Sequence, residues 1–211
     1  SDREHLQHAL NAEKHLGETD VSGFFFDIAP YPFQQEILDR LEAERIIRGH
    51  YKNLVVAATG TGKTVVSAFD YKRFVHGNQG ASNRLLFVAH REEILRQSLS
   101  CFRTVLRDPN FGDLFVGRNR PENTDHLFMS IQTFHSQEMD TKVSPDFYDY
   151  IIIDEFHHAA APTYQKLLDY FSPSILLGLT ATPERMDKKS ILTYFDNRIA
   201  AEIRLPEAID R

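Results

Sequence analysis

The chain alternates between short, continuous runs of apolar residues and longer segments in which apolar residues recur at helical spacing. The apolar runs are NLVVAA, RLLFVA, DLFVG, HLFMSI, YIIID and SILLGLT. The helical segments cover residues 33–49, 63–77, 91–106 and 162–171. Continuous apolar strands that alternate with helices are typical of a parallel sheet with helices on both faces. The pattern therefore predicts an α/β fold around a mainly parallel central sheet.

Polar residues follow five of these predicted strands directly. The polar segments are TGTGKT, HRE, QTFH, DEFHH and TATPER. Ligands of open parallel sheets bind outside the carboxyl ends of the strands. We therefore expect the chemistry of this protein to lie at that edge of the sheet.

The segment AATGTGKT, residues 57–64, fits the phosphate-binding pattern G-x-x-x-x-G-K-[ST] except that Ala57 replaces the first glycine. Gly60 and Gly62 let backbone amides approach phosphate oxygens, and the helix that begins near Lys63 attracts anions. Lys63 is expected to reach the β- and γ-phosphates, and the Thr64 hydroxyl to coordinate Mg²⁺. A glycine-rich turn with an exposed lysine is the alternative. The predicted nucleotide contacts in this loop are Thr59, Gly60, Thr61, Gly62, Lys63 and Thr64.

The segment YIIIDEFHH supplies two adjacent carboxylates at a strand end. Asp154 has the position of the acid that holds Mg²⁺ beneath a phosphate loop, and Glu155 could orient and deprotonate the attacking water. Alternatively, both acids could simply begin a helix, where its dipole favours negative charge. His157 and His158 have no third ligand nearby in the sequence, so a polar relay is favoured over a metal site.

Composition narrows the class of protein. Hydrophobic residues make up 42% and charged residues 26% of the 211 residues, and the net charge is −6. This charge argues against a dedicated basic nucleic-acid module but not against an enzyme that contacts nucleic acid through local loops. No apolar run approaches the ~20 residues of a membrane span, so no membrane partner is expected. The chain has one cysteine, Cys101, so an internal disulfide is excluded, which fits a reducing, cytoplasmic location. The apolar neighbours of Cys101 predict that it is buried.

The segments ATGTGKT, DEFHH and TATPER, in this order, resemble motifs I, II and III of superfamily-two helicases and translocases. VAHREEILRQ and GLTATPERMD are similar to the branch that includes ATPase subunits of type I and type III restriction enzymes and related DNA repair helicases. Alanine is common at the position of Ala57 in that branch. The resemblance implies a three-layer, RecA-like P-loop NTPase that uses ATP and Mg²⁺ to move on or remodel DNA in restriction or repair. It implies a catalytic set of Lys63, Asp154, Glu155 and His157.

The resemblance also suggests roles for residues outside the phosphate loop. Gln34, in YPFQQE, resembles the glutamine that hydrogen-bonds adenine, and Tyr31 could stack on the base, although the segment could equally be an ordinary helix start. Thr180 and Thr182 resemble motif III, which couples the nucleotide to the nucleic acid. Pro183 leaves a simple tight turn as the alternative.

His90 and Arg91 resemble motif Ia, and Gln132 and Thr133 resemble motif Ib, so all four are candidate nucleic-acid contacts. A salt bridge at a helix start is the alternative for Arg91. Such contacts go to the sugar–phosphate backbone and carry no sequence specificity. AHREE and TAT favour single- or double-stranded DNA over the RNA of DEAD-box proteins. A DExH-type RNA helicase is the first alternative, and a P-loop kinase or regulatory NTPase the second.

The resemblance covers residues 31–205. Residues 1–30 are expected to form a flank with a helix over residues 2–16, and residues 206–211 the start of a linker. Nothing after TATPER resembles the arginine-bearing motif VI, so we expect the partner in cis to be a second RecA-like domain. Its arginine finger would be worth about 10³–10⁵ in rate. The 211 residues alone are therefore expected to bind ATP·Mg²⁺ and hydrolyse it weakly.

Overall fold

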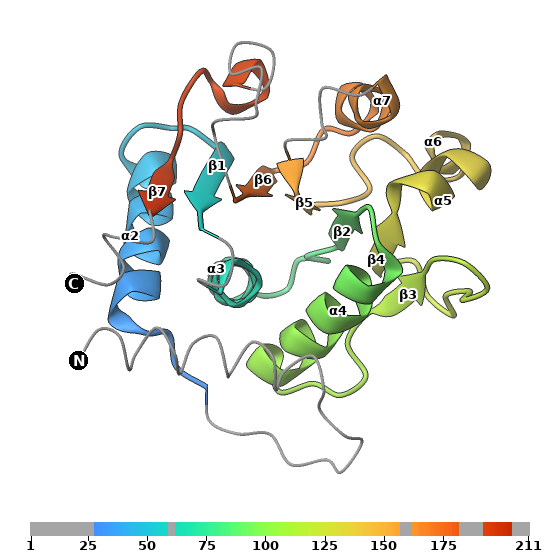
Figure 1. Cartoon of the computed structure of the whole chain (residues 1–211), viewed down its shortest axis with the longest axis horizontal. Helices are drawn as coiled ribbons and strands as arrows, with labels where there is room; N and C mark the ends of the chain where they lie inside the picture. The colour runs from blue at the N-terminus through green and yellow to red at the C-terminus, as the bar shows by residue number, and fades with distance from the viewer. Residues whose placement is uncertain (1–27, 59–61, 157–161, 182–191, 204–211) are drawn as a thin grey trace.

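The computed structural model describes residues 28–58, 62–156, 162–181 and 192–203 (Figure 1). The helix expected over residues 2–16 lies outside these ranges. So do several residues singled out in the sequence, namely Thr59, Gly60, Thr61, His157, His158, Thr182 and Pro183.

A single sheet forms the centre of the fold. Its strands are β1 (Lys52–Ala57), β2 (Leu85–Ala89), β3 (Asp113–Phe115), β4 (His126–Ser130), β5 (Tyr150–Asp154), β6 (Ile175–Thr180) and β7 (Ala201–Ile203). They lie in the order β3-β4-β2-β5-β6-β1-β7, and every pairing between them is parallel. The predicted α/β fold with a mainly parallel sheet is confirmed.

Helices cover both faces of the sheet (Figure 1). On one face lie α2 (Pro32–Ile46), α3 (Lys63–Gly77) and α4 (Glu92–Leu106). On the other lie α5 (Ile131–Ser136), α6 (Met139–Lys142), α7 (Pro162–Tyr170) and the 3₁₀ helix η2 (Thr193–Phe195). Strand side chains alternate between the two layers, so Phe87 and Ile152 pack under α2–α4 while Val88 and Ile153 pack under the opposite layer. The result is the expected three-layer arrangement with two apolar cores, and Cys101 is buried in the first, as predicted.

The parallel direction of the strands brings their carboxyl ends to one edge. Strand β6 lies between β5 and β1, with Asp154 opposite Leu179 and Val56 opposite Thr180. The ends of β5, β6 and β1 are therefore neighbours, although they are far apart in the sequence. The strand ends at which the polar segments begin thus lie along one edge, as expected.

Four of the described elements, α5, α6, η2 and β7, were not expected from the sequence. Helix α5 begins immediately after β4, where the Ser130 hydroxyl accepts a hydrogen bond from the Thr133 backbone N–H at 3.1 Å. Strand β7 is a three-residue edge strand that pairs with the end of β1. Strand β7 is too short to recognise from the sequence, because three residues cannot establish an alternation of apolar and polar positions.

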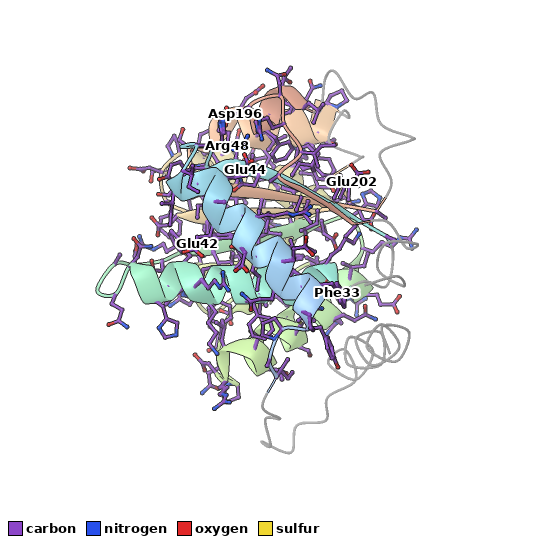
Figure 2. All side chains as sticks on the ribbon, turned by 90° about the vertical axis from the view of Figure 1, so that its left-hand side faces the viewer. Phe33, Glu42, Glu44, Arg48, Asp196 and Glu202 are labelled. Carbon is purple, nitrogen blue, oxygen red and sulfur yellow. The ribbon has the colours of Figure 1, made fainter. Side chains whose placement is uncertain are left out.

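The segment before β7 is tied to α2. Arg198 donates from Nε and Nη2 to the buried Glu44 carboxylate, at 3.2 and 2.9 Å. His50 Nδ1 lies 3.1 Å from a carboxylate oxygen of Asp196. Figure 2 shows this end of α2, with Glu44 and Arg48 labelled on the helix and Asp196 beyond it. These contacts hold β7 against the strand that leads into the phosphate loop.

None of the helices in the described ranges is long and apolar enough to cross a membrane.

Candidate nucleotide site and strand-end surface

The two ends of the turn from β1 into α3 are placed as a phosphate loop requires. Strand β1 ends at Ala57, and α3 starts at Lys63 with Gly62 as its N-cap residue. Gly62 has φ +80°, a left-handed conformation that glycine adopts without a Cβ penalty. Thr59, Gly60 and Thr61 lie between these points, outside the described residues, so their predicted phosphate contacts stay predictions.

Lys63 and Glu155 meet at this edge of the sheet. Lys63 Nζ lies 3.7 Å from Glu155 Oε1, and the lysine side chain is only 10% exposed. Lys63 is the first residue of α3, whereas Glu155 follows β5 directly. The sheet thus brings together two side chains that are 92 positions apart, and a phosphate group here would meet both a cation and a carboxylate.

Asp154 is the last residue of β5 and is 6% exposed. Its position two residues after Ile152 places it on the sheet face covered by α2–α4. Burial raises the pKa of its carboxyl group to about 6; Lys63 lowers the pKa and Glu155 raises it. The Glu155 backbone N–H also donates to Asp154 Oδ1 at 2.9 Å. A buried carboxylate with this pKa is a group that a bound cation would stabilise.

Magnesium fits this donor set. No cluster of three His, Cys, Asp or Glu that could hold a metal occurs in the described residues. Mg²⁺ does not need such a cluster, because it is usually bound through one or two carboxylates, water and substrate phosphates. Asp154 and the half-buried Thr64, at the second position of α3, are the residues that would hold it.

The backbone at Glu155 has an unusual conformation. Its φ is +57°, in the left-handed region that non-glycine residues rarely enter. Such a residue costs of order 1 kcal/mol or more and tends to occur at functional sites. The Glu155 side chain is 30% exposed. Glu155 is therefore accessible to water, while Asp154 beside it is not.

Gln34 lies against the end of the phosphate loop. It is 1% exposed, and its Oε1 accepts a hydrogen bond from the Tyr31 backbone N–H at 3.0 Å. A Cβ at Gly62 would overlap Gln34 Nε2, so the two residues are in close contact. The Tyr31 ring is half-buried and parallel to that of Phe33, with centroids 6.3 Å apart. The position beside the loop is compatible with adenine recognition, which stays a prediction for both Gln34 and Tyr31.

Thr180 ends β6 and is completely buried. Its hydroxyl has no hydrogen-bond partner among the described residues, and neither has the buried hydroxyl of Tyr164 on α7. Burial, Asp154 and Glu155 all raise the pKa of Tyr164. Sequence reasoning missed Tyr164, because a tyrosine at a buried helix position carries no signal that separates it from an ordinary core residue. The coupling role of Thr180 is not tested by these contacts.

The candidate nucleic-acid residues occupy the ends of β2 and β4, which are adjacent strands. His90 and Gln132 are exposed, and Gln132 Nε2 lies 3.1 Å from His90 Nδ1. Arg91 is exposed beside them as the N-cap residue of α4. Thr133, in contrast, is only 8% exposed, and its hydroxyl lies 2.8 Å from Ser130 Oγ at the start of α5. The structure thus brings His90, Arg91 and Gln132 to one surface, but not Thr133.

Comparisons with known proteins agree with this geometry. A family model described as type III restriction enzyme, res subunit, matches residues 27–185. A type I restriction enzyme EcoAI endonuclease subunit from Escherichia coli is 31% identical over 185 residues, covering 81% of this chain and 21% of that protein. The putative ATP-dependent helicase IRC3 from Saccharomyces cerevisiae is 28% identical over 175 residues, covering 78% of this chain and 25% of that protein. The chain thus spans about a fifth to a quarter of these relatives.

Two solved structures share the fold. The Hef helicase domain of Pyrococcus furiosus superposes with a TM-score of 0.64 at 20% identity, covering 85% of this chain and 39% of that one. The SWI2/SNF2 ATPase core of Sulfolobus solfataricus, solved in complex with dsDNA, also has a TM-score of 0.64, at 15% identity, covering 84% of this chain and 38% of that one. One is a helicase domain and the other an ATPase core, and the predicted RecA-like fold is confirmed.

Proposed function

This chain belongs to the family of type III restriction enzyme res subunits, and we propose that it is an ATP-binding motor domain that couples ATP hydrolysis to movement on or remodelling of DNA, in restriction or repair. The membership makes it a helicase-type ATPase domain of superfamily two. The DNA-directed activity and the biological role are the proposed part. The relatives include both restriction subunits and putative helicases, so either role remains compatible with the same domain.

The observation that carries the proposal is that Lys63, Asp154 and Glu155 meet at the carboxyl-terminal edge of the sheet. When ATP binds, the Lys63 ammonium would turn from Glu155 to the β- and γ-phosphates. Glu155 would then no longer pair with Lys63 and could accept a proton from the attacking water, for which its partly exposed position is suited. Mg²⁺ held by Thr64 and Asp154 would supply electrostatic stabilisation of the phosphate charge.

We further propose that residues 31–205 are the first of two RecA-like domains, preceded by a flank over residues 1–30. Residues 206–211 would begin a linker to the second domain. This arrangement is supported by the relatives, which are several times longer than this chain. A second domain in cis would close over the nucleotide and add the arginine that this part of the chain is not expected to supply. His157 and Thr182 are assigned to catalysis and coupling by their motifs alone.

DNA is the proposed polymer, reached through backbone contacts from His90, Arg91 and Gln132. Two comparisons support DNA: one relative is named as a restriction endonuclease subunit, and one structural neighbour was solved with dsDNA. RNA is the alternative polymer. A cytoplasmic location is proposed together with the restriction role. Neither assignment affects the ATP chemistry.

The test compares Lys63→Ala and Glu155→Gln with the native chain. Binding of a fluorescent ATP analogue and single-turnover hydrolysis, with protein in excess to detect slow turnover, are measured with and without duplex DNA, single-stranded DNA and RNA. Lys63→Ala should weaken binding about tenfold or more, since a charged contact to phosphate is lost. Glu155→Gln should bind normally and slow hydrolysis by about 10²–10⁴. Lys142→Ala, an exposed lysine on α6, is the matched control and should behave as native.

Native hydrolysis by Glu155→Gln would remove Glu155 from the catalytic role. Fast DNA-stimulated turnover by the 211-residue chain would contradict the two-domain part of the proposal. Stimulation by RNA alone would replace DNA with RNA as the polymer.

A further inference from the structure

A polar pocket of about 410 Å³ lies away from the nucleotide site, between α4, β3 and the loop that follows β3. Three arginines line it: Arg96 and Arg103 from α4, and Arg120 from the loop. Asn119 and two carboxylates, Asp113 and Glu122, complete its polar lining. The volume falls in the range of about 300–1,000 Å³ that ligand pockets usually have.

The two arginines on α4 are held in place by contacts to their neighbours. Arg103 donates from Nε and Nη2 to the backbone carbonyls of Phe111 and Gly112, at 2.7 and 2.9 Å. Arg96 donates from Nε and Nη2 to a single carboxylate oxygen of Glu92, at 3.1 and 2.8 Å. A guanidinium has five N–H donors, so each arginine retains donors for a ligand.

Arg120 is fixed in a similar way. Its Nη1 donates to the carbonyls of Gly117 and Asn119, at 2.8 and 3.0 Å, and its guanidinium lies 5.5 Å from the centroid of the Phe115 ring. Because the three guanidinium groups are already positioned, a ligand that binds them has little side-chain entropy to remove. Planar guanidinium groups match the oxygens of phosphate, which makes phosphate the favoured ligand group.

The charge of the pocket indicates which kind of phosphate. The lining residues, three arginines and two carboxylates, carry a net charge of +1, and Glu92, which pairs with Arg96 beside the pocket, offsets that charge. A phosphodiester carries a single negative charge and is repelled less by Asp113 and Glu122 than a free phosphate or phosphomonoester, which carries more negative charge. The surrounding segment is also distinctive, since residues 84–126 contain seven arginines and no lysine in a chain of net charge −6.

The pocket lies along α4, the helix that begins beside His90, Arg91 and Gln132. Helix α4 begins immediately after Arg91, and Glu92 in its first turn holds Arg96. Glu92 Oε1 also accepts a hydrogen bond from Asn119 Nδ2 at 3.4 Å, which anchors the arginine-bearing loop beside the helix start. A DNA strand that passes the end of β2 and then the end of β4 would therefore reach the loop after β3 next.

We propose that this pocket binds a backbone phosphodiester of the DNA strand that leaves the His90–Gln132 surface. This rests on the proposed function, because it requires DNA at the strand ends. It adds Arg96, Arg103 and Arg120 to the binding surface and sets its outer limit at β3, the edge strand of the sheet.

The test measures binding of fluorescein-labelled duplex DNA to the 211-residue chain by anisotropy over a series of salt concentrations. Arg120→Ala should weaken binding about tenfold and reduce the slope of log K against log [salt] by about 1, since one phosphate contact is lost. Glu122→Gln should strengthen binding severalfold, because it removes a negative charge from the pocket. A gain in affinity cannot result from misfolding, so this variant separates a role in binding from a loss of folding in Arg120→Ala. Arg40→Ala, an exposed arginine on α2, is the charge-matched control and should bind as native.

Equal affinity and salt slope for Arg120→Ala and the native chain would overturn the pocket. Weaker binding by Arg120→Ala with no gain from Glu122→Gln would also overturn it, as would Arg120-dependent binding of inorganic phosphate without any effect on DNA. If the native chain bound no DNA, both this inference and the DNA part of the proposed function would fail. If Glu155→Gln hydrolysed ATP normally while Arg120→Ala lost DNA affinity, only the catalytic assignment would fail.

Discussion

The side chain of Gln34 occupies the space that a side chain at Gly62 would need. An ideal Cβ on Gly62 would overlap Gln34 Nε2, and Gly62 already has the left-handed φ of +80°. The start of α2 is thus in contact with the N-cap of α3, where the phosphate loop ends. A substitution at Gly62 therefore disturbs the Gln34 side chain, and a substitution at Gln34 changes the space beside Gly62.

Gly62→Ala should therefore impair both stability and nucleotide binding. The left-handed conformation alone costs an alanine about 1–2 kcal/mol, and the overlap with Gln34 adds to this. Urea unfolding and binding of a fluorescent ATP analogue measure the two effects. Gly77→Ala is the matched control, since a Cβ there meets nothing within 4 Å and its φ is not left-handed. Gln34→Ala removes the overlap but also the hydrogen bond to the Tyr31 N–H, so the cost of Gly62→Ala is measured in both the native and the Gln34→Ala background. In the Gln34→Ala background only the conformational cost should remain, and an equal cost in the two backgrounds would contradict the overlap.

Asp70→Asn should strongly destabilise the fold. Arg45 Nη1 and Nη2 each donate to one Asp70 oxygen at 2.8 Å, the Tyr150 hydroxyl donates to the same carboxylate, and both ionic side chains are buried. Removing the Asp70 charge leaves the Arg45 charge buried without its partner, at a cost of about 3–5 kcal/mol in urea unfolding. Arg40→Ala removes an exposed ion pair with Glu36 and should cost less than about 0.5 kcal/mol. Equal effects of the two variants would show that burial does not determine the value of the Arg45 pair.

Asp154→Asn should stabilise the nucleotide-free chain above pH 6. Burial raises the pKa of Asp154 from 3.8 to about 6, so the folded state binds this proton more tightly than the unfolded state. Stability is therefore lost as the pH rises from about 4 to 6, and the cost at pH 8 is about 2–3 kcal/mol. Asparagine is neutral at every pH and avoids this cost. Urea unfolding in EDTA at pH 5 and pH 8 tests the difference, and an Asp154→Asn chain less stable than native at pH 8 would contradict it.

His126→Asn should reduce the loss of stability in mild acid. Burial, together with Arg84, lowers the pKa of His126 below its ordinary value of 6.5, and its Nδ1 accepts a hydrogen bond from the Leu85 backbone N–H at 3.3 Å. The unfolded state then binds the proton more tightly, so stability falls as the pH drops below about 6.5. Asparagine offers an uncharged acceptor at a similar position. Thermal unfolding between pH 7 and 5 should show a smaller loss for His126→Asn than for the native chain, while His76→Asn, exposed on α3, should match native.

The periodicity of apolar residues was sufficient to predict most of the fold. The continuous apolar runs became six of the seven strands in the described sheet. The signal is strongest for β1, β2, β5 and β6, because strands buried on both faces need apolar residues at nearly every position. The three-residue β7 and the direct start of α5 after β4 could not be predicted. A strand of three residues has no readable period, and the onset of α5 depends on the Ser130 hydroxyl accepting from the Thr133 N–H.

The site was predictable in its parts but not in its contacts. The motifs identified Lys63 and Glu155 separately, whereas their approach to 3.7 Å follows from the placement of β6 between β5 and β1. The burial of Thr133 removes its side chain from the surface that His90 and Gln132 share, which no motif indicates. Arg96, Arg103 and Arg120 carry no recognisable spacing, and only the packing of β3 against α4 brings them to one pocket.

By itself, the sequence determined the α/β class, the phosphate loop and the edge of the sheet where the chemistry lies. These depend on local chemistry, namely apolar runs, glycines before a helix, and polar residues after strands. The tertiary structure alone decided which distant side chains meet, as in Lys63 with Glu155 and Arg45 with Asp70. Strand order and helix packing set these distances, and they result from the burial of both sheet faces at once rather than from any one segment.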